Sequence, residues 1–115
     1  MTMRAHKLKM WPAPFKSLKL GGKNCDLRFA DRDYRVGDYV MFVEFDPAKE
    51  ALTGDYECRE ITHITTGDNV PRGLIDGFVI LSLDMVVGPE RDALLGQESM
   101  FGGSVEWQAP MEAKS

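Results

Sequence analysis

Short runs in which apolar and polar residues alternate recur along most of this chain, and turn residues separate them. A period of two is typical of strands with one buried face, and this pattern limits the fold to one built mainly from strands. One stretch, residues 12–20, has helical spacing instead, with Pro12 at its start and Gly21 beyond its end. The runs that predict strands cover residues 6–10, 24–29, 39–45, 56–65 and 77–83.

These elements predict a mainly β (α+β) domain. Short hairpin connections and one short covering helix favour a small, partly closed antiparallel β-barrel. A chain of 115 residues has room for one hydrophobic core, so we expect a single domain over residues 5–84. Residues 85–115 show little periodicity, and we expect them to form a C-terminal extension of uncertain order, with a short helix over 89–95, that the barrel does not need.

The charge is distributed unevenly along the chain. Residues 1–36 carry nine Lys and Arg against three Asp, a net of +6, and residues 37–115 carry five against fifteen Asp and Glu, a net of −10, which gives the total of −4. A basic segment on an acidic body can present one positive patch to a phosphate-bearing partner. Alternatively, the two parts neutralise each other in the fold.

Cysteine content and hydropathy indicate a cytoplasmic protein. Cys25 and Cys58 have no CxxC motif and no histidine at metal-ligand spacing, so both are expected to be reduced and structural. No apolar run approaches the roughly 20 residues of a membrane helix, and the N-terminus lacks the apolar stretch of a secretory signal. We therefore expect no membrane partner.

The sharpest group of candidate binding residues is Lys23, Asp26 and Arg28. Alternation places Asp26 and Arg28 on one face of a strand, where a carboxylate can orient a planar guanidinium towards a phosphate or a base edge. The alternative is a surface ion pair of little energetic value.

Three further candidates extend this surface. Arg32, between Asp31 and Asp33, can be held in direction by ion pairing, whereas Tyr34 nearby is expected to pack inward. Lys9 belongs to a set of lysines that can be a basic surface or simply a solvated one. Trp11 precedes the helix and can be a stacking wall of a cleft, although tryptophan at such a junction is more often core.

No strong catalytic or metal-binding motif is present. His6 and His63 lack a cysteine or carboxylate at ligand spacing, so no metal is expected. The sequence has no P-loop, no GxGxxG and no Ser-His-Asp signature, so we expect no cofactor and no established catalytic residue.

Six stretches together suggest a family. They are HKLKMWP at 6–12, GKNCDLR at 22–28, DRDYRVGD at 31–38, EFDP at 44–47, TG at 53–54 and GFVILSL at 77–83. In order and spacing they resemble an uncharacterised bacterial and bacteriophage branch of the ASCH domains, which have a PUA-like β-barrel fold. The resemblance covers about two-thirds of the chain and ends after Asp84.

The resemblance implies a binding cleft beside the helix, with Lys23 at its mouth, Asp26 at the acidic position and Arg28 at the basic one. This branch more often has Glu where Asp26 stands. One group of ASCH proteins resembles amidohydrolases of modified cytidine that use a Lys and a Thr three residues later. Here the Thr position is Asp26, which cannot supply an alkoxide nucleophile, so that activity is not carried over.

The expected function is therefore a nucleic-acid- or nucleotide-binding module that binds RNA or a nucleotide-like ligand through a basic cleft beside the first helix. Two alternatives remain open. One is a hydrolase of a modified nucleoside, with Lys23 and Asp26 as acid and base. The other is a phage-encoded factor that binds a host protein through the acidic body or the extension.

Overall fold

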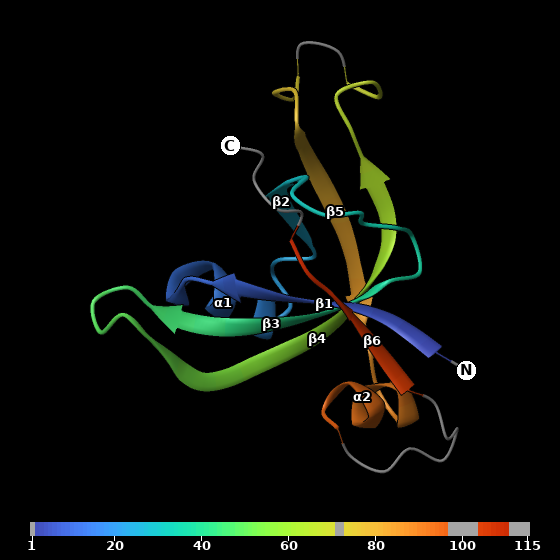
Figure 1. The fold of residues 1–115 in the computed structure, drawn as a ribbon. Helices are drawn as coiled ribbons and strands as arrows, with labels where there is room; N and C mark the ends of the chain where they lie inside the picture. Colours follow the sequence, from blue (N-terminus) through green and yellow to red (C-terminus); the bar gives the residue numbers. More distant parts are fainter. Residues whose placement is uncertain (1, 71–72, 97–103, 111–115) are drawn as a thin grey trace.

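The computed structural model describes residues 2–70, 73–96 and 104–110 and shows a mainly β protein (Figure 1). This confirms the expected fold class. The elements in chain order are β1 (Thr2–Met10), α1 (Pro12–Lys19), β2 (Cys25–Phe29), β3 (Tyr39–Asp46), β4 (Ala51–Thr65), β5 (Phe78–Met85), α2 (Pro89–Leu94) and β6 (Ser104–Gln108).

All six strands belong to one sheet in the order β2-β5-β4-β3-β1-β6. The sheet is mixed rather than antiparallel throughout, because β1 runs parallel to both β3 and β6. Among the described residues β2 and β6 are its two open edges, so the sheet is not closed into a barrel. The expectation of an antiparallel sheet missed that β1 and β3 are parallel, with α1, β2 and the loop after β2 forming the crossover between them.

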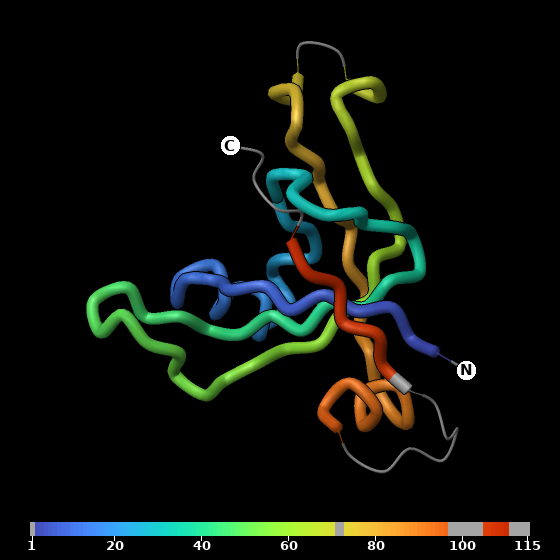
Figure 2. Tube along the Cα trace, in the orientation of Figure 1, coloured from blue at the N-terminus to red at the C-terminus, as the bar shows by residue number. Residues whose placement is uncertain are grey.

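The long strand β4 joins two parts of the sheet. Its first part pairs with β3 and its second part with β5, and the register shifts between Ile61 and His63. Figure 1 shows the result, with the β3 and β4 hairpin extending to one side and the β4 and β5 pair extending upward. The loop after β2 has to pass β5 and β4 to reach β3, and Figure 2 shows it crossing there.

Helix α1 forms where the sequence predicted it. Pro12 occupies its first turn, where a missing N–H costs nothing, and Gly21 beyond its end has a φ of 84°. The helix buries Phe15 and Leu18 against the sheet. The largest core cluster therefore lies between α1 and the inner face of the sheet, with Phe42, Ile61 and Leu81 fully buried opposite.

The C-terminal extension contributes to a second core cluster. Ala93 and Leu94 of α2 pack against Met3, Met41 and Cys58 on the other side of the sheet. Strand β6, which was not expected from the sequence, adds to the outer side of β1. Residues 97–103 and 111–115 of the extension lie outside the described residues.

Both cysteines are free, as expected, and burial raises the pKa of the Cys58 thiol. Cys25 is exposed on the edge strand β2. Within residues 2–70, 73–96 and 104–110, no helix is long and apolar enough to cross a membrane.

Candidate functional site: a basic groove

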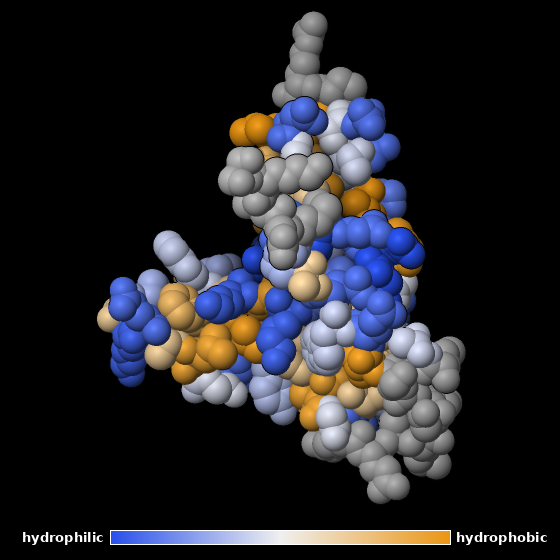
Figure 3. Space-filling model, viewed as in Figure 1, coloured by the Kyte–Doolittle hydropathy of each residue, from blue (hydrophilic) through white to orange (hydrophobic). Residues whose placement is uncertain are grey.

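A hollow of about 560 Å³ opens between β1, β2 and the loop that follows β2, with the end of β6 beside it. We call it the basic groove. In Figure 3 hydrophilic side chains gather over this central part of the molecule, where β1, β6 and the loop meet. The charged side chains that line the groove are Lys7, Lys9, Arg28, Asp31 and Arg32, and the aromatic ones are Phe29 and Tyr34.

Arg28, on the edge strand β2, lines the groove with its side chain. Its Nε donates to Asp26 Oδ2 at 2.5 Å, and its Nη2 donates to the Lys9 carbonyl oxygen at 2.8 Å. The guanidinium also lies 5.9 Å from the centre of the Phe42 ring. These contacts connect β2 to β1 across the open side of the sheet and fix the direction of the Arg28 side chain, as the alternation of β2 predicted.

Asp26 orients cations rather than facing a ligand itself. Its side chain is 10% exposed, and its second oxygen, Oδ1, lies 3.4 Å from Lys23 Nζ. Lys23 borders a different hollow, together with Arg59 and Asp84, and does not line the basic groove. The structure therefore brings Asp26 and Arg28 together as expected, and links Lys23 to the groove only through Asp26.

Arg32 is 8% exposed and lines the basic groove. Its Nε lies 3.3 Å from Asp31 Oδ1, and its Nη1 donates to the Gln108 carbonyl oxygen at 3.3 Å. The predicted pairing with Asp31 is present, whereas Asp33 pairs with Arg4 and Arg35 instead. Arg32 thus ties the loop to β6, a contact that could not be foreseen without knowing of β6.

Lys7 and Lys9 are the groove cations without a carboxylate partner among the described residues. Lys9 Nζ lies 4.9 Å from the centre of the Phe45 ring, and Lys7 Nζ lies 5.5 Å from that of Trp107. Both side chains alternate outward from β1, as predicted, and are exposed. Their charge is available to a ligand.

The two aromatic candidates differ in position. Tyr34 packs inward against the main core cluster, as expected, and also lines the groove, and burial raises its pKa to about 12. Trp11 is 63% exposed at the start of α1 and is absent from the groove lining. Trp11 therefore does not line the groove that the structure forms.

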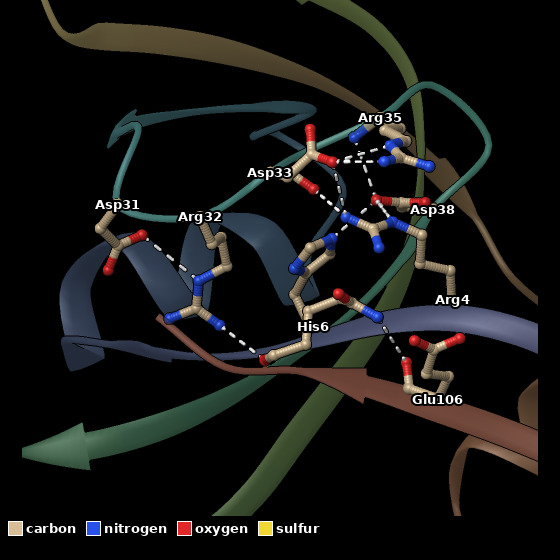
Figure 4. A network of polar contacts seen from close by, with 9 residues as sticks. Arg4, His6, Asp31, Arg32, Asp33, Arg35, Asp38 and Glu106 are labelled. Atoms are coloured by element: carbon tan, nitrogen blue, oxygen red, sulfur yellow. Dashed lines mark hydrogen bonds and ion pairs between the residues drawn. The ribbon is translucent and has the colours of Figure 1, made fainter. Parts of the chain in front are cut away.

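A buried polar network beneath the groove was not predicted. Asp38 Oδ2 accepts hydrogen bonds from His6 Nε2 at 2.7 Å, Arg4 Nε at 3.1 Å and the Arg35 backbone N–H at 3.0 Å (Figure 4). Alternation had placed His6 on the buried face of β1, and a histidine at a core position was the signal available. The network fastens the loop that carries Arg32 and Tyr34 to β1.

His6 in this network is fully buried. Desolvation by burial lowers its pKa, although Asp38 acts in the opposite direction. Because a carboxylate oxygen accepts, His6 Nε2 donates the hydrogen bond to Asp38. The His6 Nδ1 atom and the Tyr34 hydroxyl are both buried without a hydrogen-bond partner among the described residues, and the two rings lie 4.8 Å apart.

The groove has the chemistry of an anion site. It combines four cationic side chains with one lining carboxylate, Asp31. In the described part of the chain, no three His, Cys, Asp or Glu residues are grouped to hold a metal ion.

Fold and groove define a small domain with an open, mixed β-sheet and a basic hollow at its open side. The family model described as "Domain of unknown function (DUF3850)" matches residues 5–83, and the chain belongs to this family. No curated protein matches the chain.

Proposed function

We propose that the chain is a nucleic-acid- or nucleotide-binding module, and that RNA or a nucleotide-like ligand occupies the basic groove. The observation that carries the proposal is the convergence of Lys7, Lys9, Arg28 and Arg32 on one hollow of a chain whose net charge is −4. Concentrating positive charge against the overall balance favours a phosphate-bearing ligand.

The cations of the groove have different tasks in this proposal. Arg28 and Arg32 are held by carboxylates and carbonyl oxygens, so they present fixed guanidinium edges that suit phosphate oxygens or base edges. Lys7 and Lys9 supply mobile charge that tolerates different phosphate positions. Such a combination fits a ligand that is positioned by its phosphates and then read by fixed donors.

Size and lining support a ligand of nucleotide dimensions. A volume of about 560 Å³ falls within the usual range of about 300–1,000 Å³ for small-molecule sites. Phe29 and Tyr34 give the groove aromatic surface, on which bases of single-stranded RNA stack.

We further propose that the fold is an ASCH-like variant of the PUA-like barrel that acts in the cytoplasm. In this interpretation the sheet from β2 to β1 forms the barrel wall, and the basic groove is the seam between β1 and β2. The proposal is for binding rather than turnover, because both oxygens of Asp26 are engaged by cations and leave it a poor general base.

Binding measured by fluorescence anisotropy tests this function. Labelled single-stranded RNA and free nucleotides are titrated at low salt with wild type, Lys9→Ala and Arg28→Ala. Lys49→Ala and Arg91→Ala are matched controls, since Lys49 lies in the turn before β4 and Arg91 on α2, away from the groove.

Each groove variant is expected to weaken binding and to reduce the dependence of log K on log salt by about one unit, because one phosphate contact is lost. The controls should match wild type. Equal binding by all five proteins, or no binding by a folded wild type at low salt, would contradict the proposal.

A further inference from the structure

The edge strand β2 has backbone groups that nothing in the described chain pairs. Within the described residues its one neighbour in the sheet is β5. Backbone hydrogen bonds from Leu83 N to Asn24 O at 2.9 Å and from Ala30 N to Gly77 O at 2.8 Å lie at the two ends of this pairing. Hydrogen-bonded positions alternate along an antiparallel pair. The even-numbered residues therefore face β5, and the N–H and C=O groups of Cys25 and Leu27 point to the free edge.

The outer face of β2 is apolar beside this open edge. Leu27 and Phe29 are 56% and 59% exposed, and Ile75 nearby is 75% exposed. Leu27, Leu74, Ile75 and Phe78 line a shallow hollow of about 290 Å³. An unprotected edge with a contiguous apolar face is a site where another strand adds.

We propose that the strand that adds is β2 of a second copy of this chain, antiparallel to the first and related by a two-fold axis at Leu27. In this register Leu27 faces Leu27 of the second copy and exchanges both backbone hydrogen bonds with it. Cys25 then faces Phe29 of the second copy on the apolar side. Asp26 faces Arg28 of the second copy on the other side, so this register sets opposite charges beside the Asp26–Arg28 pair that each chain already forms.

The sequence of β2 excludes the neighbouring two-fold registers. Pairing centred on Asp26 or on Arg28 would set like charges directly opposite each other. Centring on Leu27 pairs all five residues of the strand and opposes the charges, which is why a second copy fits this edge.

The dimer is expected to be weak and dependent on concentration. Two strands of five residues bury less than the roughly 1,600 Å² of a standard stable interface. The dimer contact includes Arg28 and Phe29, which also line the basic groove, so both experiments below are done without a groove ligand.

Sedimentation velocity under reducing conditions tests the dimer. Wild type is expected to shift from monomer to dimer as concentration rises, whereas Leu27→Lys stays monomeric because two ammonium groups would meet on the axis. Leu20→Lys is the matched control, since Leu20 is 75% exposed beyond the end of α1, and it should dimerise like wild type. A wild type that is monomeric at its highest soluble concentration, or a dimer that survives Leu27→Lys, overturns the proposal.

Disulfide trapping tests the register. In a Cys25→Ser background, Leu27→Cys should crosslink on oxidation, because hydrogen-bonded antiparallel pairs have Cα atoms about 5.5 Å apart, within disulfide range. Val87→Cys in the same background is the control, because Val87 is 68% exposed and lies off the edge. Thermal unfolding verifies that each variant is folded. Equal crosslinking of both variants, or none by Leu27→Cys, contradicts the register.

Discussion

Replacing Asp38 by asparagine is expected to destabilise the protein strongly, because one carboxylate organises the network beneath the groove. The Asp38 side chain is 5% exposed, and its Oδ2 accepts three hydrogen bonds, from His6, Arg4 and the Arg35 backbone. Hydrogen bonds to a charged group contribute about 1.5–3 kcal/mol, and neutral ones about 0.5–1.5 kcal/mol. In Asp38→Asn the bond from Arg4 keeps its cationic donor, whereas the bonds from His6 and the Arg35 backbone become neutral, which lowers the free energy of unfolding by about 2 kcal/mol.

Urea unfolding of wild type, Asp38→Asn and Asp33→Asn measures this effect. Asp33→Asn is the matched control, because Asp33 is 59% exposed and its pair with Arg35 lies on the surface. Removing such a pair should cost less than about 1 kcal/mol. A loss for Asp38→Asn as small as that for Asp33→Asn, with the urea dependence unchanged, would refute the reasoning that the buried carboxylate holds the loop.

Three other expected outcomes follow from the structure. Because burial lowers the pKa of His6 in the folded state, the unfolded state binds the proton more tightly, and the melting temperature should fall as pH drops below about 6.5. His6→Gln should flatten this pH dependence, whereas His63→Gln, at an exposed position, should retain it. In urea unfolding, Gly77→Ala should lower the free energy of unfolding more than Gly54→Ala does. Both glycines have positive φ (88° and 95°), but of the two only Gly77 would bring an added Cβ within 3.0 Å of a neighbouring ring. Equal losses of free energy would contradict this. Truncation after Val87 removes α2 and β6 and should leave a cooperative thermal transition at lower temperature, and an unfolded product would show that the extension is essential.

Local patterns in the sequence accounted for most of the strands and for helix α1. Alternation located β2 and the burial of His6, Leu8 and Met10, because a strand with one buried face imposes a period of two. Strand β6 was missed because it is a short edge strand whose placement comes from pairing with β1. Pairing between distant segments leaves little trace in a five-residue window.

The candidate site was predictable in part for the same reason. Asp26 and Arg28 are two residues apart on one strand, so their contact follows from local geometry. The contacts of Arg32 with Gln108 and of His6 with Asp38 join segments far apart in the chain. Those contacts depend on the crossing of the loop over the sheet, which no local pattern encodes.

The central claim is that the basic groove binds a phosphate-bearing nucleotide, and an amide NMR titration tests it most directly. A nucleoside monophosphate is added to the labelled protein at low salt, and each backbone amide is followed. The account predicts saturable shifts at Lys7, Lys9, Arg28 and Arg32, with Arg91 on α2 unchanged. Shifts confined to residues outside the groove, or none at all in a folded sample, would contradict it.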